Sequence, residues 1–249
     1  MESEGFYVTL PSNASKELFK DNTSGCYTVD LAKPIELTGE WTVGLCEFIY
    51  PRTWYNLPPD ASYLELMRTT EEEDQPLVIL KFGRGGHYGR IKDLLEHLVP
   101  AIQKYDPSFE ASFNNITKRL DVKGNGSHKI KAFPPLAYML GLRANEWWTL
   151  SKRSTPYPCD MSAGVYNLFL YTDIVQYQPV GDSYSPLLSV VNVKGDYGDV
   201  VSIRHNTVHY LRVSKKYIKT IRVEIKTDRD RFVDFVYGKT IVKLHFKPA

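Results

Sequence analysis

Apolar and polar residues alternate along much of the chain, most clearly between Val208 and Phe246. A period of two places successive side chains on opposite faces of a β-strand, so this pattern predicts strands with one buried face. Eight principal strands are expected, at residues 6–11, 26–31, 41–50, 165–176, 187–193, 207–214, 218–226 and 240–246. A further short run at 200–204 alternates as well. The apolar phase changes near Cys46 and Glu47, which predicts a β-bulge in the third strand.

The middle of the chain has a different pattern, which predicts a compact α+β insertion over about residues 60–142. Apolar residues recur at helical spacing between Ile91 and Gln103, and Pro100 should kink or end this helix. Short apolar runs predict four strands around the helix, at residues 63–67, 77–82, 109–113 and 119–122. We expect these strands to form one small sheet that covers the apolar face of the helix. That face is formed by Leu94, Leu95 and Leu98, and the water-facing residues are Lys92, Glu96 and Gln103.

Neither end of the chain alone has enough strands to cover both faces of a core, so the two ends are expected to share one sandwich. Eight antiparallel strands of these lengths are typical of a jelly roll. The predicted fold is therefore mainly β, an antiparallel jelly-roll β-sandwich formed by residues 1–57 and 161–249. An inserted α+β subdomain and a loop that contains proline and tryptophan occupy residues 58–160.

The composition is that of a folded protein, with 43% apolar and 24% charged residues among 249. The formal net charge of +2 is too small for a general nucleic-acid binder, so no specific nucleic-acid partner is expected. No apolar run approaches the roughly 20 residues that span a bilayer, and the first residues lack the form of a signal peptide. Three widely spaced cysteines, Cys26, Cys46 and Cys159, are typical of reduced thiols packed as small core residues.

Four stretches carry residues that could do chemistry, and a structural role is favoured for each. Gly83–Gly86 precedes the predicted helix but lacks both common phosphate-binding glycine patterns. His205 and His209 would lie too far apart on a strand to share a metal ion without a bend. The carboxylates of Glu71–Asp74 point apart in a turn, and Cys159 has no histidine nearby in the sequence. The sequence therefore predicts no catalytic, cofactor-binding or metal-binding residue, and no enzymatic activity.

The adjacent aromatic residues Trp147 and Trp148 lie in a stretch expected to be a loop, 145–162. Such a pair could stack on a sugar or a base, or anchor a partner chain. Packing of the loop onto its own domain is favoured, because tryptophan side chains are usually largely buried.

Several segments at the two ends of the chain together form a recognisable order of motifs. They lie at residues 6–15, 34–37, 39–45, 50–51, 54–56, 171–175, 180–182, 186–188, 235–239 and 242–246. In this order they resemble the minor capsid, or penton, proteins of Polinton/Maverick-type virus-like transposons and of adintovirus-like elements. The segments are packing and turn motifs rather than catalytic signatures, and residues 60–142 match no motif of that family.

The resemblance implies a jelly-roll capsomer that forms a homopentamer at capsid vertices, beside a major capsid protein of the double-jelly-roll type. It implies a structural protein of the virion, without enzymatic activity, that is assembled inside the host cell. A closed ring needs head-to-tail contacts between neighbours, which the aromatic loops 54–59 and 147–158 and the strand edges could supply. The alternative is a non-catalytic β-sandwich module that recognises a glycan or a receptor through Trp147 and Trp148.

Overall fold

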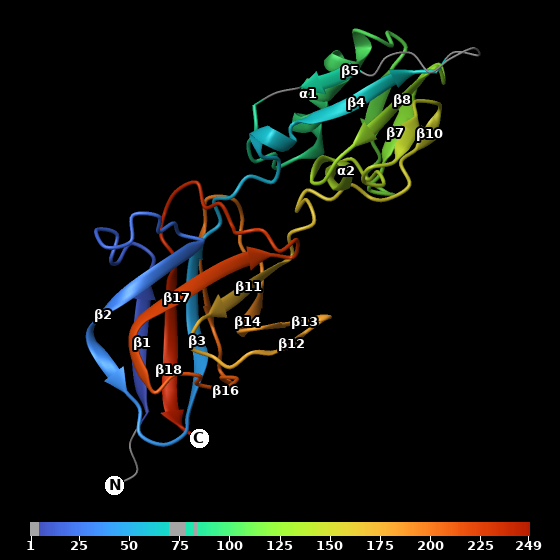
Figure 1. Cartoon of the computed structure of the whole chain (residues 1–249). Helices are drawn as coiled ribbons and strands as arrows, with labels where there is room; N and C mark the ends of the chain where they lie inside the picture. The colour runs from blue at the N-terminus through green and yellow to red at the C-terminus, as the bar shows by residue number, and fades with distance from the viewer. Residues whose placement is uncertain (1–4, 70–77, 82–83) are drawn as a thin grey trace. The chain divides into compact units, whose positions relative to one another are not determined.

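The computed structural model describes residues 5–69, 78–81 and 84–249 (Figure 1). The chain divides into two compact units, one of Met1–Trp54 with Val165–Ala249 and the other of Tyr55–Gly164. The carboxylate run Glu71–Asp74 and the first glycine of the Gly83–Gly86 stretch lie outside the described residues.

The first unit is a sandwich of two antiparallel sheets. One sheet has the order β1-β18-β3-β15, with bounds Phe6–Pro11, Ile241–Pro248, Trp41–Pro51 and Val200–Arg204. The other has the order β14-β11-β17-β2, with bounds Leu187–Asn192, Asn167–Thr172, Tyr217–Thr227 and Cys26–Glu36. Counted along the chain, these eight strands have the orders 1-8-3-6 and 5-4-7-2, which is the jelly-roll arrangement. The expected fold class is confirmed, and the two ends of the chain interleave in both sheets.

The core lies between the two sheets and follows from the alternation. In β17, Ile221, Val223 and Ile225 are buried, and their polar neighbours face outward. Two buried tyrosines, Tyr27 and Tyr50, have polar partners at the margin of the core. The hydroxyl of Tyr50 accepts a hydrogen bond from the backbone N–H of Lys194 at 2.9 Å. The hydroxyl of Tyr27 donates to the carbonyl of Leu10 at 3.0 Å, and burial raises the pKa of Tyr27. Each buried ring therefore keeps a hydrogen bond for its hydroxyl group, which limits the free-energy penalty of desolvation.

Strand β3 contains the expected bulge, because its register against β18 shifts between Lys243 and Leu244, opposite Cys46. The expectation that residues 207–214 form the sixth strand is wrong. That segment contains only the two-residue strand β16 (Leu211–Arg212), whereas the sixth core strand is β15.

The reason lies along the eleven-residue edge of β3. Strand β15 pairs with residues 47–51 of β3, and β16 pairs with residues 42–43. The connecting segment presses onto Gly44, where an added Cβ would lie 2.4 Å from Val208 Cγ1 and 2.6 Å from the carbonyl oxygen of His209. Residues 207–214 lie along a sheet edge. Apolar and polar residues therefore alternate there, although most of these residues pair with no strand.

Within residues 55–69, 78–81 and 84–164, the second unit contains two sheets and two α-helices. The larger sheet has the order β5-β4-β8-β9, with bounds Val78–Lys81, Tyr63–Arg68, His128–Ala132 and Trp147–Thr149. The smaller has the order β10-β7-β6, with bounds Arg153–Ser154, Leu120–Lys123 and Glu110–Phe113. The helices are α1 (Ile91–Gln103) and α2 (Leu136–Met139), with a 3-10 turn at Pro59–Ala61.

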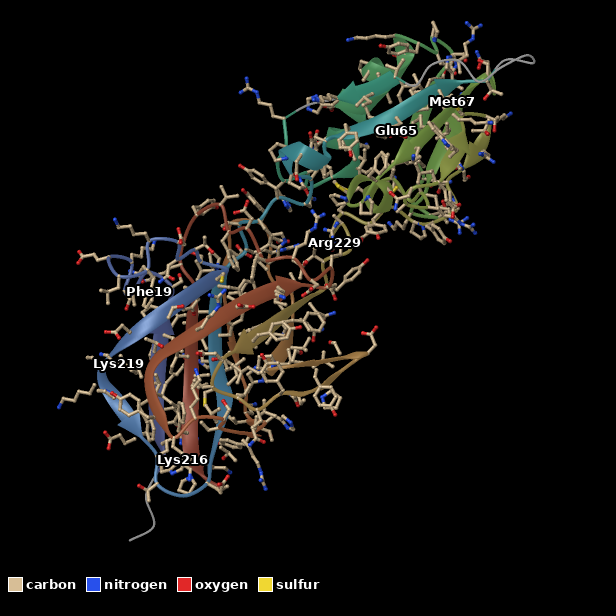
Figure 2. The ribbon with its side chains drawn as sticks, in the orientation of Figure 1. Phe19, Glu65, Met67, Lys216, Lys219 and Arg229 are labelled. Carbon is tan, nitrogen blue, oxygen red and sulfur yellow. The ribbon has the colours of Figure 1, made fainter. Side chains whose placement is uncertain are left out.

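Two expectations for this unit are wrong. The hairpin β6–β7 does not join the strands at 63–68 and 78–81, and the stretch expected to be a loop supplies the edge strands β9 and β10. Strands of two or three residues are too short to show a period of two, so the sequence gives little sign of them. The cross-strand pair of Glu65 and Lys131, with Nζ and Oε2 2.9 Å apart, supports the larger sheet. Glu65 and Met67 both lie on β4 (Figure 2).

Helix α1 has the expected faces. Its buried residues are Ile91, Leu94, Leu95, Leu98 and Ile102. Lys92, Glu96 and Gln103 are exposed, as expected. The helix continues through Pro100 and ends at Gln103, so the expectation that the proline ends it is wrong.

The packing of α1 can be tested by placing a charge on its buried face. Leu94 is fully buried, so Leu94→Asp should lower the free energy of unfolding by about 3 kcal/mol or more, because an unpaired carboxylate is costly in an apolar site. Lys92→Asp, which introduces the same side chain on the exposed face, is the matched control and should change it by less than about 1 kcal/mol. Urea unfolding of both variants measures the difference, and equal midpoints would contradict this packing.

Candidate functional site

The glycine stretch before α1 has a structural role. The backbones of Gly86 and Leu57 exchange two hydrogen bonds, with N···O distances of 2.8 and 3.2 Å. A Cβ at Gly85 would lie 2.1 Å from the backbone nitrogen of Pro59. Residue 85 therefore has to be glycine, because two backbone segments approach closely there. The N–H group of Gly86 is already bound to the carbonyl of Leu57, so it is not directed at a ligand.

The two histidines, His205 and His209, differ in their surroundings. His205 is half-buried, whereas His209 is exposed and its carbonyl lies over Gly44. In residues 5–69, 78–81 and 84–249, no three histidine, cysteine or acidic side chains are grouped so that they could hold a metal ion. Over the same residues, no helix has the length and apolar character needed to cross a membrane.

Cys159 is held as a protonated thiol. Burial raises its pKa from 9.0 to about 12, against a weaker opposing effect of a backbone hydrogen bond. A thiol with this pKa is almost entirely protonated at neutral pH, so it is a poor nucleophile.

Trp147 and Trp148 lie on the edge strand β9 and point to opposite faces of its sheet. Trp148 packs against the core of its unit, as the favoured reading expected, and the guanidinium of Arg153 lies 4.6 Å from its ring centroid. Trp147 is 39% exposed, with the ammonium of Lys131 5.4 Å from its ring. The two rings therefore cannot form one stacking platform for a ligand.

A buried acid–histidine pair in the second unit was not foreseen from the sequence. Asp106 is fully buried, its Oδ1 accepts hydrogen bonds from Ser108, and its Oδ2 lies 3.7 Å from Nδ1 of His128. The hydroxyl of Ser127 lies 3.1 Å from the same ring nitrogen. A serine–histidine–aspartate relay needs the serine and the acid on different ring nitrogens. The two side chains therefore lie next to one another between the end of α1 and β8, and this arrangement does not activate the serine.

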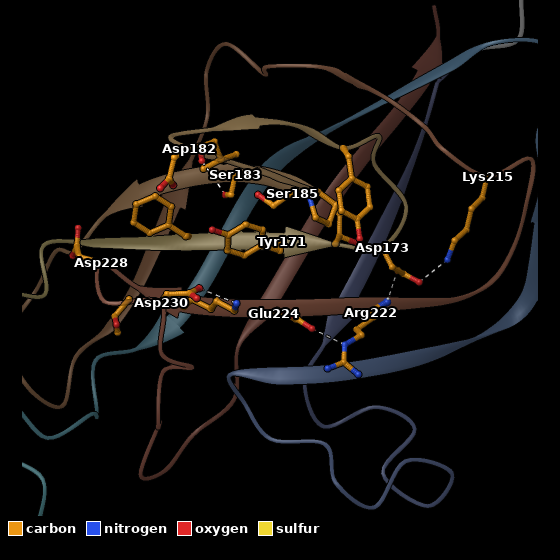
Figure 3. A pocket seen from close by; sticks show the side chains of 17 residues that line it. Tyr171, Asp173, Asp182, Ser183, Ser185, Lys215, Arg222, Glu224, Asp228 and Asp230 are labelled. Carbon is orange, nitrogen blue, oxygen red and sulfur yellow. Dashed lines mark hydrogen bonds and ion pairs between the residues drawn. The ribbon is translucent and has the colours of Figure 1, made fainter.

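An open groove of about 1000 Å³ lies on the outer face of the sheet β14-β11-β17-β2 (Figure 3). Its floor is formed by the outward side chains of β11 and β17, which alternate with the buried ones. Cross-strand register places Tyr171 beside Glu224 and Phe169 beside Lys226. The hairpin of β12 (Gln178–Val180) and β13 (Ser183–Ser185) supplies the opposite wall.

Each basic side chain of the groove is bound to a carboxylate. The ammonium of Lys215 lies 2.6 Å from Asp173, and that of Lys226 lies 2.8 Å from Asp230. The guanidinium of Arg222 donates to Glu224 at 2.8 Å. The hydrogen bond to a carboxylate raises the pKa of Arg222 and of Lys226 above its ordinary value.

Two further carboxylates of the groove, Asp182 and Asp228, are not part of these ion pairs. Asp228 binds the start of β11, where it accepts hydrogen bonds from the backbone N–H groups of Tyr166 and Asn167 and from the side chain of Asn167. Burial alone would raise the pKa of Asp228, but these hydrogen bonds together lower it below its ordinary value of 3.8. The groove thus has an excess of negative charge.

The two lateral sides of the sandwich are also candidate surfaces. Strands β1 and β2 end the two sheets on one side, and β15 and β14 end them on the other. Each side carries exposed apolar residues. On the first side Leu18, in the connection to β2, is 68% exposed, and on the second Val200, in β15, is 74% exposed. Exposed apolar side chains beside sheet edges are suited to contacts between chains. The edge of β2 is partly covered by the preceding loop, where Asn22 and Ser15 bind the backbone of Thr28 and Asp30.

Comparison with known proteins identifies the fold of this chain. No family model matches the chain, and no curated protein matches it. Among solved structures, the chain is similar to the mavirus penton protein, whose crystal structure was determined with selenomethionine. The alignment covers 99% of this chain and 100% of that chain, with a TM-score of 0.56 and 10% sequence identity. The chain therefore has the fold of that protein over its full length, including the inserted unit.

The hydrogen bonds of Asp228 predict a pH-dependent contribution to stability. Because its pKa is lowered in the folded state, the contribution is present above the unfolded value of 3.8 and is lost as the pH falls through the folded pKa. Asp228→Ala should destabilise the protein by about 1 kcal/mol at pH 7 and by much less at pH 2. The value at pH 7 is small because water screens the exposed carboxylate. Thermal unfolding at both pH values measures this, with Asp234→Ala as an exposed control in the same loop. A loss that is the same at both pH values would contradict the assignment.

The state of Cys159 predicts its reactivity. A rise in pKa from 9.0 to about 12 lowers the thiolate fraction at pH 8 by about a thousandfold. A more basic thiolate is also more nucleophilic, which offsets part of this loss. Iodoacetamide should therefore alkylate Cys159 at least about fiftyfold more slowly in the folded protein than in urea, as followed by mass spectrometry of its peptide. Folded and unfolded rates within tenfold of one another would show that the thiol is not protected.

Proposed function

We propose that this chain is a structural protein of a virion, a penton-type minor capsid subunit. The observation that carries the proposal is the full-length match in fold to a penton protein, in which both the sandwich and the inserted unit take part. The order of sequence motifs at the two ends of the chain supports the same role. Together they favour an origin in a Polinton/Maverick-type or adintovirus-like element.

The proposed subunit acts through contacts rather than through chemistry. The histidine, serine and aspartate that come together share one ring nitrogen, and the thiol of Cys159 is protonated. The basic residues of the groove are held by carboxylates. These arrangements stabilise the fold and support a non-enzymatic role.

The proposed assembly is a homopentamer at a capsid vertex, next to a major capsid protein of the double-jelly-roll type. A closed ring requires two different surfaces on each subunit, so that the head of one meets the tail of the next. We assign these surfaces to the two lateral sides of the sandwich. The side with Leu18 would contact the side with Val200 of the neighbouring subunit, and would bury on the order of 800 Å² on each partner.

The proposed interface predicts the effect of charges at its two sides. Leu18→Asp and Val200→Asp should each lower incorporation into particles at least tenfold, because a carboxylate would have to be buried in an apolar contact. Both side chains are largely exposed in the single subunit, so both variants should fold normally. Ile116→Asp is the matched control, since Ile116 is 92% exposed but lies in the inserted unit.

The measurement is co-expression with the cognate major capsid protein, followed by mass analysis of purified particles and imaging of their vertices. The expected result is a pentamer of this chain at each vertex. Particles that close fully in its absence, with the chain never found at their vertices, would refute the capsid role. Normal incorporation of both interface variants would refute only the assignment of the lateral surfaces.

A further inference from the structure

We propose that the groove on the outer face of the sheet β14-β11-β17-β2 binds a neutral glycan. This activity goes beyond capsid structure and does not depend on it, because all residues of the groove belong to one sandwich. The proposal also places glycan recognition away from Trp147 and Trp148, whose rings point to opposite faces of their sheet.

The aromatic side chains of the groove provide apolar surface for a sugar ring. Phe169 and Tyr171 project from β11 into the floor, since the alternate residues Leu168 and Leu170 are buried in the core. Tyr177 also lines the groove and is 68% exposed. One face of many hexose rings carries mainly C–H groups, which pack favourably against an aromatic ring.

The polar side chains of the groove suit hydroxyl groups. Asp182, Ser183 and Ser185 line the hairpin wall, opposite Glu224 on the floor. Carboxylate oxygens accept hydrogen bonds, and serine hydroxyls both donate and accept, so together they match the mixed character of sugar hydroxyls. A few polar groups placed around an apolar surface are typical of ligand sites.

The charges of the groove select against an anionic ligand. Its three basic residues are each paired with a carboxylate, and two more carboxylates remain at Asp182 and Asp228. A phosphate, a nucleic acid or a sialylated sugar would therefore meet net repulsion. A neutral polyhydroxyl ligand would not.

The backbone of the floor disfavours an extended peptide. Strand β11 is paired on both edges, with β14 and β17, and β17 is paired with β11 and β2. A peptide lying on this floor could not add to the sheet as a further strand, which is the main source of affinity in that mode of recognition. A ligand must instead bind through side chains.

The test applies the full chain to an array of immobilised neutral and sialylated oligosaccharides, and then measures the affinity of the best neutral glycan by titration. Tyr177→Ala should weaken binding roughly five- to tenfold, because it removes a stacking surface. Tyr184→Ala is the matched control. Tyr184 lies on the same hairpin and is 71% exposed, but it points away from the groove, between Ser183 and Ser185.

The expected result is binding of a neutral glycan that Tyr177→Ala weakens and Tyr184→Ala leaves unchanged. Asp182→Asn provides a second variant of the exposed rim and should weaken the same glycan. The proposal is overturned if no neutral glycan binds, if only sialylated glycans bind, or if neither groove variant changes the affinity. It is also overturned if an oligoarginine peptide binds and no glycan does, since the groove would then serve a cationic polypeptide.

Discussion

The hydrogen bonds that hold β18 between β1 and β3 are the constraint on which the sandwich depends. Three side chains of β18, Val242, Leu244 and Phe246, are fully buried. They close one sheet over the core, and β17 has the same place in the other sheet, between β11 and β2. Because the last strands complete sheets begun by the first, the chain can leave the sandwich after β3 and return at β11. The inserted unit is possible for this reason, since it interrupts a connection and no sheet.

The groove illustrates how register creates a surface. Its floor comes from two strands far apart in the sequence, and the pairing of Tyr171 with Glu224 brings an aromatic ring next to a carboxylate. The outward residues of these strands are polar or aromatic because the inward ones fill the core. The ion pairs then fix the long side chains of Arg222 and Lys226 along the floor. The same alternation that builds the core therefore also determines the chemistry of the outer face.

Most of the sandwich could be predicted from the sequence, because long half-buried strands such as β17 and β18 carry a clear period of two. The helix α1 was visible for a similar reason, through Leu94, Leu95 and Leu98. The short strands β9, β10 and β16 escaped prediction, since two or three residues show no period. The groove could not be predicted either, because the sequence around Tyr171 and Asp182 does not indicate which distant strand lies next to it. The pair of Asp106 and His128 is separated by a turn and a hairpin, so only the tertiary fold brings the two side chains together.

The interleaving of the two ends has a consequence for synthesis. Strands β1 and β3 emerge from the ribosome early, but the strand that joins them is the last of the sandwich. Until β18 has emerged, both keep an unpaired edge beside exposed apolar side chains, a state prone to aggregation. Pairings between residues so distant in sequence also raise the contact order, which slows folding. The sandwich therefore forms only after translation of the inserted unit, whose own contacts lie within Tyr55–Gly164 and can form first.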